Sequence, residues 1–259
     1  MNDIGRIARV LGEAEKTRRA VGPVSDLVVG GLTADLGHAV CEAGIQARIA
    51  DGERIAGYKV GATNMHVRLA MGLPDATYGY LMGTMILPTG GELRMDEFID
   101  PRLECEICFR LARDLAGPDL TIEQVLDATE AVSASFELCD SRIKDWKCPY
   151  PDWLADNGFA ARIVLPDRWL PVGDIDLLEE AVVLTQDGNK IAEGKGEMVL
   201  GHPANAVAWL ARKLHERGRS LSAGMVVMTG SLTTVTPVER ASRYVASFSR
   251  LGTVEKRFV

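Results

Sequence analysis

The chain has 259 residues, 47% of them hydrophobic and 25% charged, a balance typical of a globular protein with a buried core. Its formal net charge of −7 argues against a nucleic-acid partner, because phosphate binding requires a basic surface. No run approaches the ~20 apolar residues of a membrane helix, and the charged N-terminus does not match a secretory signal. The cysteines lie far apart or within predicted strands, so we expect reduced thiols in a cytoplasmic protein.

The N-terminal part of the chain has the spacing of amphipathic helices. Apolar positions predict one helix over residues 3–20 and a second from about Thr33 to Asp51, joined by a Pro/Gly connector. The pattern then changes to short strands and glycine-rich turns, with one or two helical turns at 64–71. We therefore divide the chain into a helical N-terminal portion, 1–55, and a β-rich portion, 56–259, which together form one structural unit.

The rest of the chain alternates strands with helices and contains no internal repeat. Thr121 has the position of an N-cap before a short helix, and a longer helix is expected over 203–217. Strands are predicted at 101–111, around Ser135–Cys139, as a pair within 180–195 about the "QDGN" turn, and near 224–230 and 242–257. No glycine-rich dinucleotide fingerprint and no P-loop occurs, so no organic cofactor is expected.

The strand "PRLECEICFRL" (101–111) carries two glutamates on one face. Successive strand side chains point to opposite sides, so Glu104 and Glu106 share the face opposite the apolar residues. Neighbouring carboxylates repel, and burying one without a partner is costly. A third carboxylate, Glu137, lies in the apolar segment "FELC". Two interpretations remain open from spacing: a Mg²⁺ or Mn²⁺ site, or a buried network neutralised by Arg102, Arg110 or Arg142.

The motifs "PRLECEICFRLARDL", "FELCDSRIKDW", "LADN" and "VLGHPANAVAWLARKL" together resemble the 2-keto-4-pentenoate hydratase group. That group includes 4-oxalocrotonate decarboxylases and belongs to the fumarylacetoacetate hydrolase superfamily. The resemblance implies an α+β fold, with a mixed β-sheet roll or barrel core of the fumarylacetoacetate hydrolase C-terminal type and a helical N-terminal portion. It also implies that Glu104, Glu106 and Glu137 hold a divalent metal, Mg²⁺ or Mn²⁺.

The same resemblance implies further site residues. Lys59 in "GYKVGAT" would be catalytic, with burial tuning it for proton transfer; a lysine reaching solvent is the alternative. Asp156 in "LADN" lies in a segment that closes over the substrate in the relatives, and is a second catalytic candidate, with a turn or an N-cap as the alternative. Arg142 would anchor that loop or a substrate carboxylate, with structural ion pairing as the alternative.

The sequence also departs from the hydratase pattern at two positions. Relatives carry an aspartate in a "PDFG"-like segment where this chain reads "ATYGY", and small or hydroxyl residues after "ADN" where this chain has Phe159. An aspartate and a serine that steer water are therefore missing, and we expect Thr77 and Phe159 to contact the substrate in a more apolar pocket. We expect His66 to be exposed, with an acid–base role of the hydrolase kind as the alternative, and His202 to be structural.

The expected function is a divalent-metal-dependent lyase of the hydratase/decarboxylase group. Its substrate would be an unsaturated 2-oxo acid similar to 2-hydroxypenta-2,4-dienoate, from meta-cleavage degradation of aromatic or steroid rings. The alternatives are a metal-dependent C–C hydrolase of an acylpyruvate-type diketo acid, and a non-catalytic relative that binds a keto acid. We expect a homo-oligomer, and association with an enzyme of the same pathway is a further alternative.

Overall fold

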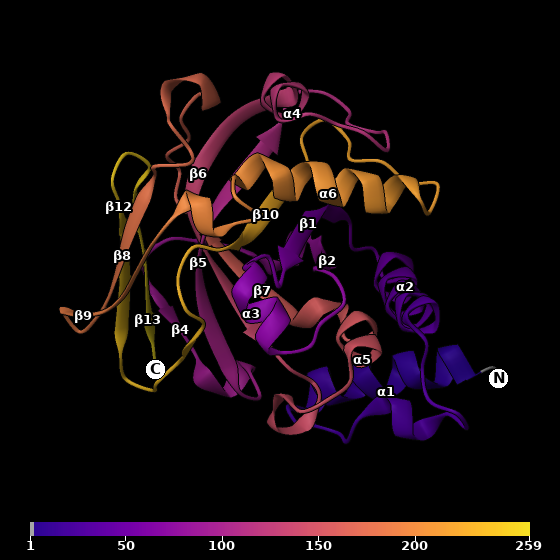
Figure 1. The fold of residues 1–259 in the computed structure, drawn as a ribbon. Coiled ribbons are helices and arrows are strands. Elements are labelled where there is room, and N and C mark those ends of the chain that lie inside the picture. The colour runs from indigo at the N-terminus through magenta and orange to yellow at the C-terminus, as the bar shows by residue number, and fades with distance from the viewer. Residues whose placement is uncertain (1–2) are drawn as a thin grey trace.

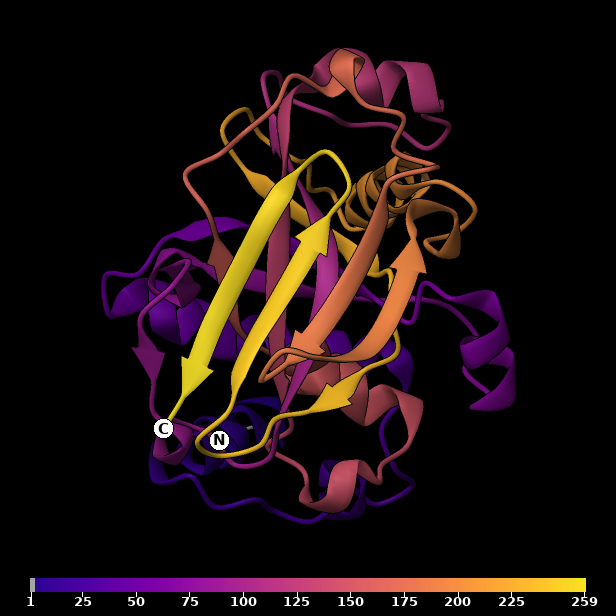
Figure 2. The same ribbon diagram turned by 90° about the vertical axis from the view of Figure 1, so that its left-hand side faces the viewer.

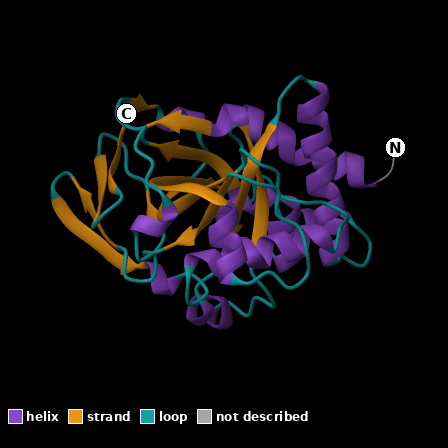
Figure 3. Ribbon diagram, turned by 90° about the horizontal axis from the view of Figure 1, so that it is seen from above, coloured by secondary structure: helices purple, strands orange, loops and turns teal. Residues whose placement is uncertain are grey.

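A computed structural model describes residues 3–259 of the chain. The helices gather on the side of the N-terminus, and the sheets extend toward the C-terminus (Figures 1 and 3). The helices are α1 (Asp3–Thr17), α2 (Ala34–Ala50), α3 (Met65–Ala70), α4 (Ile122–Ala128), α5 (Tyr150–Ala155) and α6 (Pro203–His215). The strands are β1 (Ile55–Gly61), β2 (Thr77–Met82), β3 (Ile86–Pro88), β4 (Glu92–Leu93), β5 (Pro101–Leu111), β6 (Thr129–Asp140), β7 (Ala160–Leu165), β8 (Ala181–Gln186), β9 (Asn189–Lys195), β10 (Val226–Ser231), β11 (Thr236–Pro237), β12 (Arg243–Phe248) and β13 (Gly252–Phe258).

Two mixed sheets form the core. The larger has the order β2-β1-β10-β5-β6-β7-β3, with β11 beside β5, and the smaller has the order β4-β13-β12-β8-β9. The smaller sheet covers one face of the larger (Figure 2), with β13 packed against β6 and β7. Neither order closes on itself within residues 3–259. The predicted α+β fold with a helical N-terminal portion is confirmed, as a roll of two sheets and not as a closed barrel.

The N-terminal helices form where their apolar spacing predicts. Helix α1 buries Ile7, Leu11 and Ala14 and ends at Arg18, whose φ of 58° leaves the helical region. Helix α2 starts at Thr33, whose hydroxyl accepts a hydrogen bond from the Leu36 N–H at 3.2 Å, as an N-cap does. Both helices pack together, and α2 also packs on α5.

Local capping and turn chemistry was also predictable. Thr121 caps α4 through a capping box with Gln124, and the His202 Nδ1 caps α6 by accepting from the Ala204 N–H at 3.0 Å. His202 is therefore structural, as expected. The turn between β8 and β9 has positive φ at Asp187 and Gly188, the conformation of a tight hairpin turn. Strands β2 and β7 were not anticipated.

Strands β5 and β6 are the longest pair and form the centre of the larger sheet. They run antiparallel along their whole length, with Pro101 opposite Asp140 and Leu111 opposite Thr129. Helix α6 covers β10 and β1 on one face (Figure 1). No helix in the described part of the chain is long and apolar enough to span a membrane.

The ring of His38 on α2 predicts a pH-dependent stability. It stacks on Tyr78 with a centroid distance of 5.0 Å, and burial, followed by the charge of Arg217, lowers the pKa of His38 from 6.5 to about 4. Between pH 4 and pH 6.5 the unfolded chain binds a proton at His38 that the folded protein excludes. The stability of the fold with a neutral His38 is therefore fully present above pH 6.5 and falls as the pH is lowered toward 4.

A His38→Phe variant keeps the stacking but cannot bind this proton. When the pH is lowered from 7 to 4.5, we expect its free energy of unfolding to fall by roughly 2 kcal/mol less than that of the parent. Urea unfolding at both pH values measures this difference. Parallel losses in the two proteins would contradict it.

Candidate active site

The glutamates lie on one face of the β5–β6 pair. Glu104 stands directly opposite Glu137 in the antiparallel register. Glu106 follows Glu104 by two residues on β5, and Cys139 follows Glu137 by two residues on β6, so both share this face. Glu106 and Glu137 are completely buried, with 0% of their surfaces exposed. The predicted sharing of one face by the three carboxylates is therefore present in the structure.

Lys59 on β1 extends into this cluster. Its Nζ lies 3.1 Å from Glu137 Oε1 and 3.8 Å from Cys139 Sγ, and only 2% of the residue is exposed. Its stem passes Gly158, where an added Cβ would lie 3.3 Å from the Lys59 Cε, and Gly61, where it would lie 3.2 Å from Nζ. The alternative of a lysine extended to solvent is wrong.

The charges around Lys59 oppose the effect of its burial. Burial alone lowers the pKa of Lys59, but the neighbouring Cys139 and glutamates outweigh burial and raise it above its usual value. Burial and then the Glu137 charge raise the pKa of both Glu104 and Glu106. Lys59 is thus an ammonium, and a single cation faces three carboxyl groups.

Several buried carboxylate oxygens have no hydrogen-bond donor. Glu106 Oε2 accepts from the Gly230 N–H at 2.8 Å, at a bulge where Gly230 has a φ of 104°. Glu106 Oε1 and both Glu137 oxygens lack a donor among the described residues, since the contact between Lys59 and Glu137 meets the ion-pair distance without hydrogen-bond geometry. Unpaired buried oxygens are costly, so this face suits a cation.

The donor set also suits a metal ion. One ligand atom from each of Glu104, Glu137 and Cys139 lies within 4.8 Å of the others. Glu106 lies outside this group, although it shares a strand face with Glu104. The residues therefore fit a divalent cation, which carboxylates bind well. Sequence reasoning missed Cys139, although its position two residues after Glu137 on the same strand gave the necessary information.

A cavity of about 720 Å³ opens onto Lys59, Glu104 and Cys139. Thr77 and Phe159, the two residues that the sequence predicts to contact the substrate, also line this cavity. Much of its wall is apolar.

Phe159 is held between two tryptophans of that wall, with ring centroids 4.9 Å from Trp146 and 5.0 Å from Trp153. Its φ of 64° is rare for an aromatic residue, and such conformations are concentrated at functional sites.

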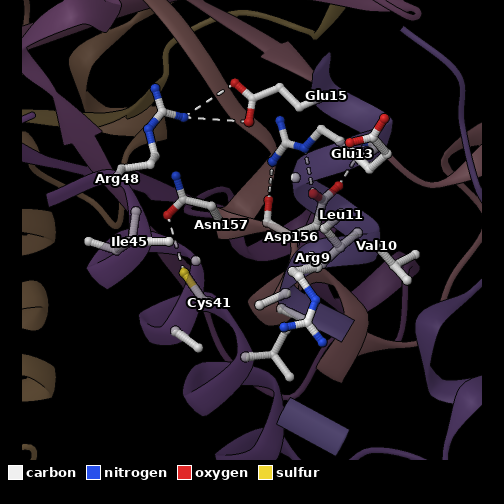
Figure 4. A pocket seen from close by; sticks show the side chains of 18 of the residues that line it. Arg9, Val10, Leu11, Glu13, Glu15, Cys41, Ile45, Arg48, Asp156 and Asn157 are labelled. Carbon is white, nitrogen blue, oxygen red and sulfur yellow. Dashed lines mark hydrogen bonds and ion pairs between the residues drawn. The ribbon is translucent and has the colours of Figure 1, made fainter. Parts of the chain in front are cut away.

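Arg142 and Asp156 do not face this cavity. Arg142 donates from Nε and its backbone N–H to the Asp156 carboxylate, and from Nη1 to the carbonyls of Asp140 and Ala160. Both residues line a second cavity beside α1 and α2, where Figure 4 shows Asp156 near Glu15 and Arg48. The catalytic role predicted for Asp156 and the substrate-binding role predicted for Arg142 gain no support from this geometry, which matches structural ion pairing.

The turn after Asp156 explains this placement. Asn157, with a φ of 53°, accepts from the Tyr80 N–H at 2.7 Å and donates to the Tyr80 carbonyl at 2.9 Å. Its side chain thereby pairs with β2 as a strand would. The turn directs Asp156 to one side and Phe159 to the other, which the sequence pattern does not reveal. His66 on α3 is exposed, as expected.

Comparison with known proteins now identifies the family. Residues 57–259 match the model for the fumarylacetoacetate (FAA) hydrolase C-terminal family. The chain belongs to this family. It is 36% identical to a 2-keto-4-pentenoate hydratase from Burkholderia vietnamiensis over 99% of this chain and 98% of that protein. It is 35% identical to a 4-oxalocrotonate decarboxylase from a Pseudomonas species, covering 81% of this chain and 80% of that protein.

Solved structures agree with this assignment. The 4-oxalocrotonate decarboxylase from Pseudomonas putida G7, complexed with magnesium and adipate, superposes with a TM-score of 0.96 at 30% identity, covering 99% of this chain and 97% of that one. A fumarylpyruvate hydrolase from Pseudomonas aeruginosa gives a TM-score of 0.62 at 19% identity over 78% of this chain and 88% of that one, which shows the shared fold alone. The resemblance inferred from the four motifs is confirmed.

We expect Asp156→Asn to lower the free energy of unfolding by about 3–5 kcal/mol, because it leaves the buried Arg142 charge without its partner. Urea unfolding measures this loss. The folded variant should retain parental divalent-metal affinity. Asp96→Asn, which removes an exposed partner of Arg94, is the control and should change stability little. An unchanged stability in Asp156→Asn with lost activity would instead support the predicted catalytic role.

We also expect Mn²⁺ to stabilise the protein, because an ion that binds only the folded state adds about 2.7 kcal/mol at a hundredfold excess over its Kd. Thermal unfolding with and without Mn²⁺ and EDTA measures this. Glu137→Gln should abolish the shift, whereas Glu130→Gln, an exposed residue on the same strand, should keep it. Equal shifts in both variants would place the ion elsewhere.

Proposed function

We propose that this chain is a divalent-metal-dependent lyase of the hydratase/decarboxylase group, acting on an unsaturated 2-oxo acid similar to 2-hydroxypenta-2,4-dienoate. The observation that carries the proposal is the opposed pair Glu104 and Glu137 beside Lys59 in a largely apolar cavity, with the Glu137 oxygens buried and without a hydrogen-bond donor among the described residues. The names of the relatives support it, and they indicate a role in meta-cleavage degradation of aromatic or steroid rings.

We assign Glu104, Glu106 and Glu137 as the ligands of Mg²⁺ or Mn²⁺. The Mg²⁺ in the solved decarboxylase and the unpaired oxygens described above support this assignment. When bound, such an ion supplies Lewis-acid stabilisation of the negative charge that develops on a 2-oxo acid. The chain itself supplies a ligand face that is already formed, since antiparallel pairing fixes Glu104 opposite Glu137.

Lys59 is the proposed proton carrier. As an ammonium clamped beside Gly158, it would deliver a proton to the substrate carbon during enol-to-keto conversion and would then recover one from solvent through the cavity. Its fixed position contributes to rate by orienting the donor. In the absence of a metal ion, the surrounding carboxyl groups raise the pKa of Lys59, which favours its ammonium form.

The apolar wall would limit the access of water to the bound substrate. Phe159 with its two tryptophans would pack on the unsaturated tail of the substrate, and Thr77 provides a hydroxyl in the lining of the same cavity. Asp156 acts in this proposal by holding, with Arg142, the turn that presents Phe159. Hydration and decarboxylation share the same electron sink and differ in whether water is admitted.

The hydrolase alternative lacks a comparable arrangement. His66 is exposed on α3, and its ring makes no hydrogen bond or ion pair among residues 3–259. The non-catalytic alternative is disfavoured by the buried Lys59, because a binding protein would not need an ammonium beside the carboxylates.

Assembly and location remain part of the proposal. The side chains of Met65, Val67, Leu69 and Met71 on and beside α3 are 48–70% exposed, an apolar patch that suits burial against another subunit. A homo-oligomer is therefore proposed. A cytoplasmic location and a pathway partner stay predictions.

The test follows ultraviolet absorbance of 2-hydroxypenta-2,4-dienoate, 4-oxalocrotonate and an acylpyruvate with Mg²⁺, Mn²⁺ or EDTA. We expect EDTA-sensitive consumption of one of the first two. Lys59→Met should lower kcat by about 10²–10⁴, the usual contribution of a positioned acid or base, while Mn²⁺ binding persists. Glu130→Gln is the matched control. Turnover of the acylpyruvate alone would favour the hydrolase, and turnover of none would contradict the lyase.

A further inference from the structure

We propose that Cys139 Sγ is a direct ligand of the ion held by Glu104 and Glu137, and that it gives the site a preference for thiophilic divalent ions over Mg²⁺. This rests on the metal site of the proposed function but goes beyond its all-carboxylate ligand set. The proposal concerns the chemical selectivity of this chain, and its test does not depend on turnover.

The position of Cys139 supports coordination. It follows Glu137 by two residues on β6, so both side chains project from the same face. Cys139 lines the cavity together with Glu104, although only 4% of the residue is exposed. Its sulfur is therefore next to the carboxylates and also open to an ion that enters from the cavity.

The distances suit a shared ion. One ligand atom from each of Cys139, Glu104 and Glu137 lies within 4.8 Å of the others. Two ligands on opposite sides of one ion are separated by up to the sum of their bond lengths, about 2.3 Å for sulfur and 2.0–2.2 Å for oxygen in a zinc site. Small side-chain rotations therefore bring all three atoms to coordination distance.

The buried carboxylate of Glu137 is an independent observation. Oε1 forms an ion pair with Lys59, but neither oxygen has a hydrogen-bond donor in the described part of the chain, and the residue is 0% exposed. A ligand is therefore needed at the point toward which Cys139 also projects. The sulfur also accepts from Lys59 Nζ at 3.8 Å, the same group that lies 3.1 Å from Glu137 Oε1.

The other cysteines have different surroundings. Cys41 donates to the Asn157 Oδ1, and Cys108 donates to the Phe109 carbonyl. Cys148 is partly exposed and is not in the carboxylate group. Cys105 is buried on the face of β5 opposite to Glu104 and Glu106. Cys139 is thus the cysteine placed for metal chemistry among the residues described.

The chemical consequence follows from ligand softness. Carboxylate oxygens suit Mg²⁺ and Mn²⁺, whereas a thiolate favours softer ions such as Zn²⁺. On binding, the S–H bond breaks, the sulfur keeps the electron pair and donates it to the ion, and the proton passes to solvent. No oxidant or reductant is involved.

The experiment titrates Co²⁺ into the metal-free full-length protein and records its absorption spectrum. We expect near-ultraviolet sulfur-to-cobalt charge-transfer absorption that saturates at one Co²⁺ per chain. Cys139→Val and Cys139→Ser should both lose this absorption while still binding Co²⁺ through the carboxylates. Cys148→Ser, the matched control, should keep it.

Competition between Cd²⁺ and Mg²⁺ gives a second readout. Replacing Cys139 by Val should reduce the preference for Cd²⁺ by about tenfold or more, comparable to the loss of a group that supports a metal ligand. An unchanged preference would overturn the proposal, as would stoichiometric Co²⁺ binding without charge transfer in the parent protein.

The outcomes also separate this proposal from the proposed function. Charge transfer without turnover of any 2-oxo acid would support the Cys139 ligand and contradict the lyase. Turnover with bound Co²⁺ but without charge transfer would support the lyase and contradict the ligand. Failure to bind Co²⁺ at all would overturn both.

Discussion

The need to neutralise buried carboxylates on one face of a sheet governs the structure around the site. Glu104 and Glu137 are fixed opposite each other by the β5–β6 register, so they cannot separate without breaking the central strands. Lys59 from β1 supplies one positive charge at 3.1 Å, which leaves the cluster short of positive charge. A divalent cation corrects this shortfall, and its Lewis acidity is then available next to an apolar cavity.

One short turn connects the helical N-terminal portion to this chemistry. Asp156 pairs with Arg142 on the side of α1 and α2, and Asn157 pairs with β2. Gly158 lies against the stem of Lys59, and Phe159 enters the cavity. Because consecutive residues contact different elements, a change in helix packing would move both the lysine and the aromatic wall.

The sequence predicted the features that depend on periodicity. Alternation on the strand 101–111 placed Glu104 and Glu106 on one face, and capping chemistry placed Thr121 and His202. Features that depend on tertiary geometry were not predictable. An Asn-Gly pair favours the left-handed conformation of Asn157, but the sequence does not reveal that its side chain pairs with β2 and so fixes where Asp156 points. The spacing of two residues places Cys139 on the face of Glu137, but its grouping with Glu104 required the exact β5–β6 register, which propensity alone does not set.

The central claim is that a divalent ion lies between the carboxylates of β5 and β6. A crystal structure grown with Mn²⁺, with anomalous diffraction to locate the metal, tests it most directly. We predict one strong anomalous peak per chain, within coordination distance of Glu104 and Glu137 oxygens and facing the cavity lined by Phe159. A structure in which Lys59 alone bridges the carboxylates, with Mn²⁺ bound only at the protein surface, would contradict the claim.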